Sequence, residues 1–139
     1  MNGDPFAPSV SAQKREARER AIELLYESEI RGIPITDLLE NQVMPPAQMV
    51  SDLAIGISQD IERIDAEIDA YLHEGWSLDR LGILDLWILR LGVHELQLGK
   101  APVAVVINEA VELGNRFGAT DESGAFINGV LGSAARDIR

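Results

Sequence analysis

Three cationic side chains near the start of the chain stand at a spacing that suits contact with phosphates. Lys14, Arg15 and Arg18 fall within the segment "KREAR", and residues three and four apart share one side of a helix. Cations aligned in this way contact successive phosphates of a nucleic acid and bind it by displacing its counterions. The cluster predicts a small nucleic-acid-binding patch on the first helix, with all three side chains exposed to solvent.

The same stretch has a second interpretation that needs no ligand. Arg15 and Glu19 stand four residues apart, as do Glu16 and Arg20, so both pairs suit ordinary ion pairs along one helix. The formal net charge of −11 also opposes the approach of a polyanion. Composition alone therefore leaves the ion-pair interpretation ahead.

Other motifs that carry chemistry fail at specific positions. A calcium loop starting at Asp65 would need glycine and glutamate where Ala70 and Trp76 stand. Neither His73 nor His94 has a second histidine four residues later, as a helical zinc site requires. The chain has no cysteine to serve as a thiolate ligand or nucleophile. We therefore expect no metal, no cofactor and no catalytic activity.

The length of the chain is typical of a single domain, and the absence of cysteine suits a reducing compartment. Apolar residues make up 46% of the 139 residues, which is enough to bury a core of modest size. No apolar run approaches the roughly 20 residues of a membrane-spanning helix, and the first ten residues lack the features of a signal peptide. We expect a cytoplasmic protein that makes no contact with a membrane.

Helical periodicity runs through the chain without β-alternation, which predicts an all-α fold of about seven helices. Ser11 is the expected N-cap of the first helix, which should end at Gly32. A short helix capped by Thr36 follows. Apolar residues three or four apart then predict one long amphipathic helix from Val50 to Tyr71, about six turns in length.

The second half of the chain is expected to hold three more helices. Residues 83–98 are apolar almost all round, which is typical of a helix that lies at the centre of others. Helical stripes over residues 106–117 and 126–138 complete the fold. The residues expected in the core are Ile57, Ile61, Ile64, Leu91, Val106, Ile107, Phe126 and Val130.

The predicted helices form one domain after a short tail. Residues 1–10 hold Pro and Gly without an apolar period and are expected to be flexible. Residues 11–139 are interpreted as a single domain of two small helical subdomains, covering about 11–75 and about 76–139.

Two segments resemble a known protein family. The segment "REARERAIELLYESE" (15–29) resembles the first helix of the NusB family of bacterial transcription antitermination factors. The segment "APVAVVINEAVELGNRFGATDESGAFINGVLG" (101–132) resembles the C-terminal signature of that family, and "LRLGVHEL" (89–96) matches the region between them. The resemblance extends from about Lys14 to Leu131.

This resemblance implies a NusB-like, all-α protein without enzymatic activity. Members of the family bind the boxA element of ribosomal RNA leader transcripts together with NusE, a small-subunit ribosomal protein, and help RNA polymerase to read through terminators. The arginine-rich, RNA-binding start of the family falls here on Lys14, Arg15 and Arg18.

The resemblance also implies roles for three further residues. Tyr26 matches a tyrosine near both RNA and partner, Asp85 an acidic residue at that junction, and Glu122 an acidic position near the RNA. From the residues alone, Tyr26 suits either base stacking or the core, and Asp85 suits an edge that a basic partner can reach. Glu122 also suits a plain carboxylate that the helix dipole favours.

Two alternatives belong to other functional classes. A ribosomal RNA cytosine methyltransferase can carry a NusB-like domain, but this chain has no room for the catalytic domain and no cysteine nucleophile. A protein-binding helical adaptor without direct RNA contact stays open, as does a homodimer. Three phosphate contacts predict a salt slope of only about −2, so we expect RNA binding to depend on NusE.

Overall fold

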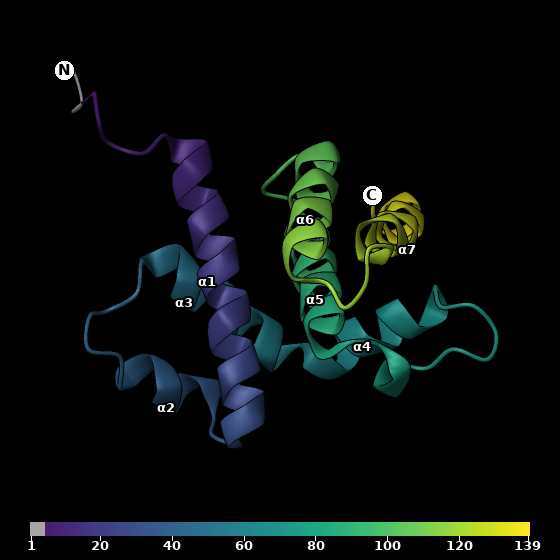
Figure 1. The fold of residues 1–139 in the computed structure, drawn as a ribbon, viewed down its shortest axis with the longest axis horizontal. Coiled ribbons are helices and arrows are strands. Elements are labelled where there is room, and N and C mark those ends of the chain that lie inside the picture. Colours follow the sequence, from purple (N-terminus) through teal and green to yellow (C-terminus); the bar gives the residue numbers. More distant parts are fainter. Residues whose placement is uncertain (1–4) are drawn as a thin grey trace.

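The computed structural model describes residues 5–139, which fold into seven α-helices and one short 3₁₀-helix without a strand (Figure 1). The predicted fold class and number of helices are confirmed. The expected tail falls partly on residues 1–4, which lie outside the described residues. The helices are α1 (Val10–Arg31), α2 (Ile35–Glu40), α3 (Gln48–Gln59), α4 (Ile61–Ala70), η1 (Leu78–Arg80), α5 (Ile83–Leu98), α6 (Val103–Phe117) and α7 (Ser123–Ile138).

Helix α1 begins two residues earlier than the sequence predicted. Its N-cap is Ser9 and not Ser11, because the Ser9 hydroxyl accepts a hydrogen bond from the backbone N–H of Ala12 at 3.1 Å. Its C-cap is Gly32, as expected, in the left-handed conformation at φ 67° that favours glycine. The Thr36 cap was also wrong, since α2 starts at Ile35 directly after Pro34.

The long helix expected from Val50 to Tyr71 is two helices with a bend at Asp60. Asp60 has φ −109° and ψ 17°, outside the α-helical range. The bend gives the two helices different neighbours, since α3 packs mainly on α1 and α4 mainly on α5. One straight helix could not follow both surfaces, and the apolar stripe that continues across Asp60 does not reveal the bend.

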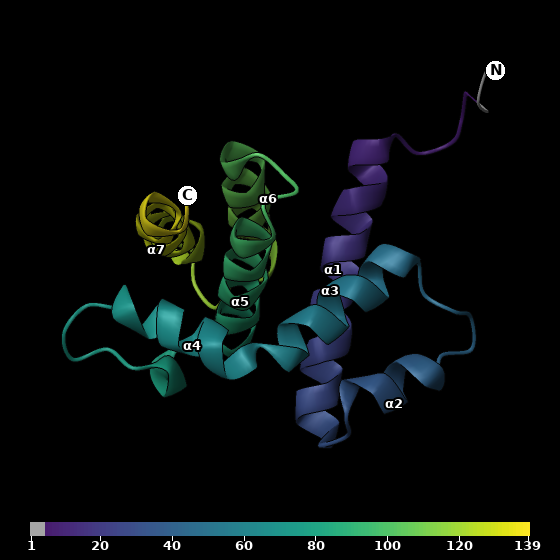
Figure 2. The ribbon, with the colours of Figure 1, turned by 180° about the vertical axis from the view of Figure 1, so that it is seen from behind.

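Helix α5 lies at the centre of the fold, as its nearly uniform apolar character predicted. It packs against α1, α3, α4, α6 and α7. Figures 1 and 2 show α1 on one side of the α5–α6 pair and α7 on the other. Gly92 lets α7 approach closely, because a β-carbon there would lie 2.6 Å from a methyl carbon of Leu131. Arg90 joins α5 to α4 by donating two hydrogen bonds to Asp65, at 2.7 and 2.8 Å.

Five of the eight residues expected in the core are buried: Ile57, Ile64, Leu91, Val106 and Val130. The other three expectations were wrong, because Ile61, Ile107 and Phe126 are only half-buried at the edge of the core. Phe126 lies beside the exposed ring of Trp76, with 6.3 Å between the ring centroids. Helical spacing identifies the inner side of a helix but not how far its neighbours cover that side.

The core is continuous from α1 to α7. Helix α4 contacts α3, α5 and α7. The division into subdomains at about residue 75 therefore stays a prediction. Across residues 5–139, no helix combines the length and the apolar character that crossing a membrane requires.

Candidate nucleic-acid interface

The predicted cationic patch lies on the N-terminal half of α1, on the side that faces α5 and α6. Lys14 and Arg15 are exposed, as expected. Within residues 5–139, Lys14 takes part in no ion pair, so its charge is available to a ligand. The predicted exposure to solvent is therefore confirmed for Lys14 and Arg15, and their role in binding stays a prediction.

The expected exposure of Arg18 was wrong. Its side chain is 4% exposed, and its guanidinium donates two hydrogen bonds to the Glu95 carboxylate of α5 at 2.8 and 3.0 Å. A bidentate pair of this kind stabilises two charges that would be costly to bury alone. Arg18 therefore faces inward although Lys14 and Arg15 face outward. Helical spacing placed the three cations on one side but could not reveal a buried carboxylate opposite Arg18.

Ion pairs join α1 to α6 in place of the expected pairs along α1. Arg15 donates hydrogen bonds to both carboxylate oxygens of Glu109 at 2.9 and 3.1 Å. This hydrogen bonding raises the pKa of Arg15 above its ordinary value. Glu19 accepts two hydrogen bonds from Arg116 at 3.0 and 3.3 Å. Arg18 also lies 3.7 Å from Glu109. Long ionic side chains therefore bridge the space between the two helices.

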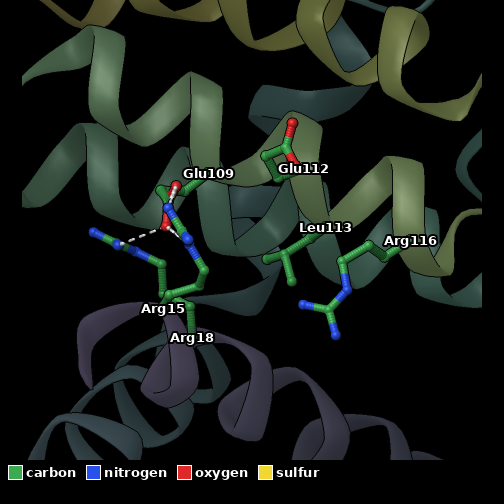
Figure 3. A pocket seen from close by; sticks show the side chains of 6 residues that line it. All are labelled: Arg15, Arg18, Glu109, Glu112, Leu113 and Arg116. Atoms are coloured by element: carbon green, nitrogen blue, oxygen red, sulfur yellow. Dashed lines mark hydrogen bonds and ion pairs between the residues drawn. The ribbon is translucent and has the colours of Figure 1, made fainter. Parts of the chain in front are cut away.

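We call this space the α1–α6 furrow, and three neighbouring cavities that share lining residues form it. Its middle, about 210 Å³, is lined by Arg15, Arg18, Glu109, Glu112, Leu113 and Arg116 (Figure 3). Arg15, Arg18 and Glu109 also line the cavity towards the start of α1, and Leu113 also lines the cavity towards its end. The three cavities therefore follow one another along α1.

The basic end of the furrow, near the start of α1, contains a cation that the sequence reasoning missed. This cavity of about 390 Å³ is lined by Lys14 and Arg15 from α1 and by Lys100 from the α5–α6 loop. Lys100 is exposed and, within residues 5–139, forms no ion pair. It lies 86 positions after Lys14 in the sequence, so only the fold brings the two together. The three cations suit a short stretch of phosphate backbone.

The apolar end of the furrow contains Tyr26. This cavity of about 470 Å³ is lined by Tyr26 and Ile30 of α1 and by Leu113 and Phe117 of α6. Tyr26 is 37% exposed, and Ile30 and Phe117 are 58% and 38% exposed. Tyr26 is therefore not a core residue, and its ring is accessible for stacking or for packing beneath another molecule.

Asp85 and Glu122 lie together, but outside the furrow. Both line a cavity of about 440 Å³ with Trp76 and Phe126. Asp85 is only 7% exposed and accepts hydrogen bonds from the Ala119 backbone at 3.2 Å and from a serine hydroxyl at 3.1 Å. The expected position of Asp85 at an accessible edge was wrong, because its carboxylate holds the α6–α7 loop.

Glu122 has a different environment from Asp85. It occupies the N-cap position of α7, and its side chain makes no capping hydrogen bond. The residue is exposed. Its carboxylate can therefore be stabilised by the dipole of α7, or it can accept hydrogen bonds from a ligand. The structure is compatible with both interpretations of Glu122.

The two histidines do not form a metal site in the structure. Among residues 5–139, no group of three or more His, Asp or Glu side chains is placed to hold a metal ion. His94 is 7% exposed within α5, and burial lowers its pKa. Its ring lies against Gly56 of α3, where a β-carbon would be 2.7 Å from the ring. His94 is therefore a packed interior residue between α3 and α5.

Comparisons with known proteins identify the family of this chain. A family model described as the NusB family matches residues 15–136. The transcription antitermination protein NusB of Thermoanaerobacter sp. (strain X514) is 39% identical over 129 residues, covering 89% of this chain and 91% of the relative.

Solved structures are similar over nearly the same length. NusB of T. maritima has a TM-score of 0.79 and 34% identity, with 89% of this chain and 91% of that chain covered. The antitermination factors NusB and NusE in complex with dsRNA provide a chain with a TM-score of 0.72 and 29% identity, with coverage of 89% and 96%.

Proposed function

This chain belongs to the NusB family, and from that premise we propose that it binds boxA RNA of ribosomal RNA leader transcripts together with NusE. The complex supports read-through by bacterial RNA polymerase. Proteins of this family are transcription antitermination factors and not enzymes. A similar chain has been solved with NusE and dsRNA. The observation that carries the proposal is the basic end of the α1–α6 furrow, where two elements distant in sequence present cations to one cavity.

The proposal divides the site residues by what their surroundings allow. Lys14, Arg15 and Lys100 contact phosphates, because they are exposed cations around one cavity. Arg18 acts indirectly, since its guanidinium is held by Glu95. By fixing α1 to α5, Arg18 positions the exposed cations opposite α6.

Tyr26, Asp85 and Glu122 complete the proposed interface. The exposed ring of Tyr26 offers a stacking surface to a base or an apolar contact to NusE. Asp85 supports the partner surface by holding the α6–α7 loop. Glu122, on that same loop, accepts hydrogen bonds from base donors in the RNA.

The charge distribution makes this binding dependent on a partner. The net charge of −11 repels a polyanion, and the basic end of the furrow offers at most about three phosphate contacts, which gives a salt slope no steeper than about −2. A basic ribosomal protein beside Tyr26 adds positive charge where this chain lacks it. Linkage then requires that RNA and NusE raise each other's affinity by the same factor.

The test is a titration of labelled boxA RNA with the protein alone and with an equimolar mixture of the protein and NusE, at two salt concentrations. We expect weak binding alone and tighter binding in the mixture. Lys14→Ala and Lys100→Ala should each weaken binding. Arg63→Ala is the matched control, because Arg63 carries the same charge at an exposed position of α4, away from the furrow.

Three outcomes would count against the proposal. An equal loss of affinity in Arg63→Ala and Lys14→Ala would show that only net charge matters. Equal RNA affinity with and without NusE would refute cooperative binding and leave a simple RNA-binding module. The absence of RNA binding in both titrations would favour the alternative function.

That alternative is a protein-binding helical adaptor without direct RNA contact. The observation in its favour is the apolar end of the furrow, which is larger than the basic end and exposes Ile30 and Phe117 beside Tyr26. An adaptor would bind NusE with an affinity that RNA leaves unchanged. Measuring NusE affinity with and without RNA therefore separates the two functions.

A further inference from the structure

Glu109 binds Arg15 in the α1–α6 furrow, so a phosphate that binds Arg15 would have to compete with this carboxylate. Its side chain is 13% exposed and accepts hydrogen bonds from Nε and Nη2 of Arg15. It also lies 3.7 Å from Nη1 of Arg18. Figure 3 shows both guanidinium groups pointing from α1 towards this one carboxylate of α6.

The contact uses the part of Arg15 that binds phosphate best. A guanidinium binds carboxylate and phosphate through the same fork of parallel N–H groups. Glu109 takes up the fork formed by Nε and Nη2. A phosphate therefore meets only the remaining N–H groups of Arg15, unless it displaces the carboxylate.

The surrounding charges do not compensate for this loss. The middle of the furrow and its ion-pair partners contain three cations, which are Arg15, Arg18 and Arg116. The carboxylates of Glu19, Glu95, Glu109 and Glu112 outnumber them by one. Of the three cations that look like one basic patch in the sequence, Arg15 and Arg18 are therefore paired with carboxylates, and Lys14 forms no ion pair within residues 5–139.

We propose that Glu109 is an internal competitor for RNA phosphate, which holds Arg15 and thereby limits the RNA affinity of this chain. This inference rests on the proposed function, since it needs RNA at the basic end of the furrow. Glu109 acts through Arg15 and is a positioning residue. RNA binds tightly only when other contacts, such as those of a partner, supply enough free energy to separate Arg15 from Glu109.

The central experiment compares Glu109→Gln with the wild-type protein in titrations of labelled boxA RNA in the presence of NusE. The glutamine keeps the size of the side chain but removes the charge. Affinity should rise about two- to fivefold, the range expected when an exposed ion pair is released. The salt slope should steepen by up to about 0.7, towards the value of about −2 that three full phosphate contacts give, because Arg15 then releases a counterion fully. A purely structural role would not change that slope.

Two controls separate competition from a general loss of acidity. Glu112→Gln removes an equal charge from the same helix, where no hydrogen bond to Arg15 is present, and should raise affinity less. In an Arg15→Ala background, Glu109→Gln should lose most of its effect. Thermal unfolding checks that each variant is folded.

The results distinguish the inference from the function on which it rests. Unchanged or weaker binding by Glu109→Gln would overturn the inference, as would an equal gain in Glu112→Gln or a full gain without Arg15. In each of these cases the wild-type protein still binds RNA. Absence of RNA binding by the wild-type protein with NusE would instead refute the proposed function and the inference together.

Discussion

The pair of Arg18 and Glu95 allows a stability prediction opposite to the one that an exposed cation would give. The two side chains are 4% and 8% exposed and share two hydrogen bonds. Removing one partner of a buried pair leaves an uncompensated charge and typically costs about 3 to 5 kcal/mol. We expect that loss in the free energy of unfolding of Arg18→Ala, with a melting temperature lower by about 10 to 20 °C.

Urea unfolding followed by circular dichroism measures this loss directly. Lys14→Ala is the control, because Lys14 is exposed on the same helix and should change stability by less than about 0.5 kcal/mol. Replacing both partners, as Arg18→Met with Glu95→Leu, should recover most of the loss, since no charge then stays buried alone. If Arg18→Ala costs less than about 1 kcal/mol, the pair is not buried in solution and our account of Arg18 is wrong.

Three further predictions concern packing and pH. Gly92→Ala should destabilise the protein by about 1 to 3 kcal/mol through a clash with α7, whereas Gly129→Ala, which meets open space, should stabilise it by about 0.5 to 1 kcal/mol in the same thermal unfolding assay. Ile127→Ala should cost about 2 to 5 kcal/mol, and the half-buried Phe126 should cost less on the same change; the reverse order would contradict the burial described above. Because burial holds the pKa of His94 below its ordinary value, stability should be complete above about pH 6.5 and should fall as the pH decreases below it. Urea unfolding across this range should show a flatter profile for His94→Gln.

Helical periodicity predicted the elements of this fold well because it reports which side of a helix is apolar. It predicted the central position of α5 and the end of α1 at Gly32. It failed at Asp60, where the backbone bends although the apolar stripe continues. A bend of this kind depends on which helices lie opposite each segment, and that information is in the packing and not in the local sequence.

The candidate site was harder to predict because its charges pair across long sequence separations. The run of cations pointed to the N-terminal half of α1, where the basic end of the furrow lies, and the exposed ring of Tyr26 lies on the same helix. The roles of Arg15 and Arg18 depend on Glu109 and Glu95, which lie 94 and 77 positions away. Lys100 lines the basic end of the furrow. The sequence did not predict this role, because a single lysine in a loop is common and indicates no binding site.

The long separation between Arg18 and Glu95 has a consequence for how the chain matures during synthesis. Helix α1 leaves the ribosome first, but Glu95 is added 77 residues after Arg18. At about 5 to 20 residues per second, Arg18 waits about 4 to 15 seconds before its partner exists. Arg15 waits longer for Glu109, which is 94 residues away. During that interval the guanidinium groups of α1 lack the carboxylates that pair with them in the folded protein. The acidic partners on α5 and α6 can therefore neutralise these groups only after most of the chain has been synthesised.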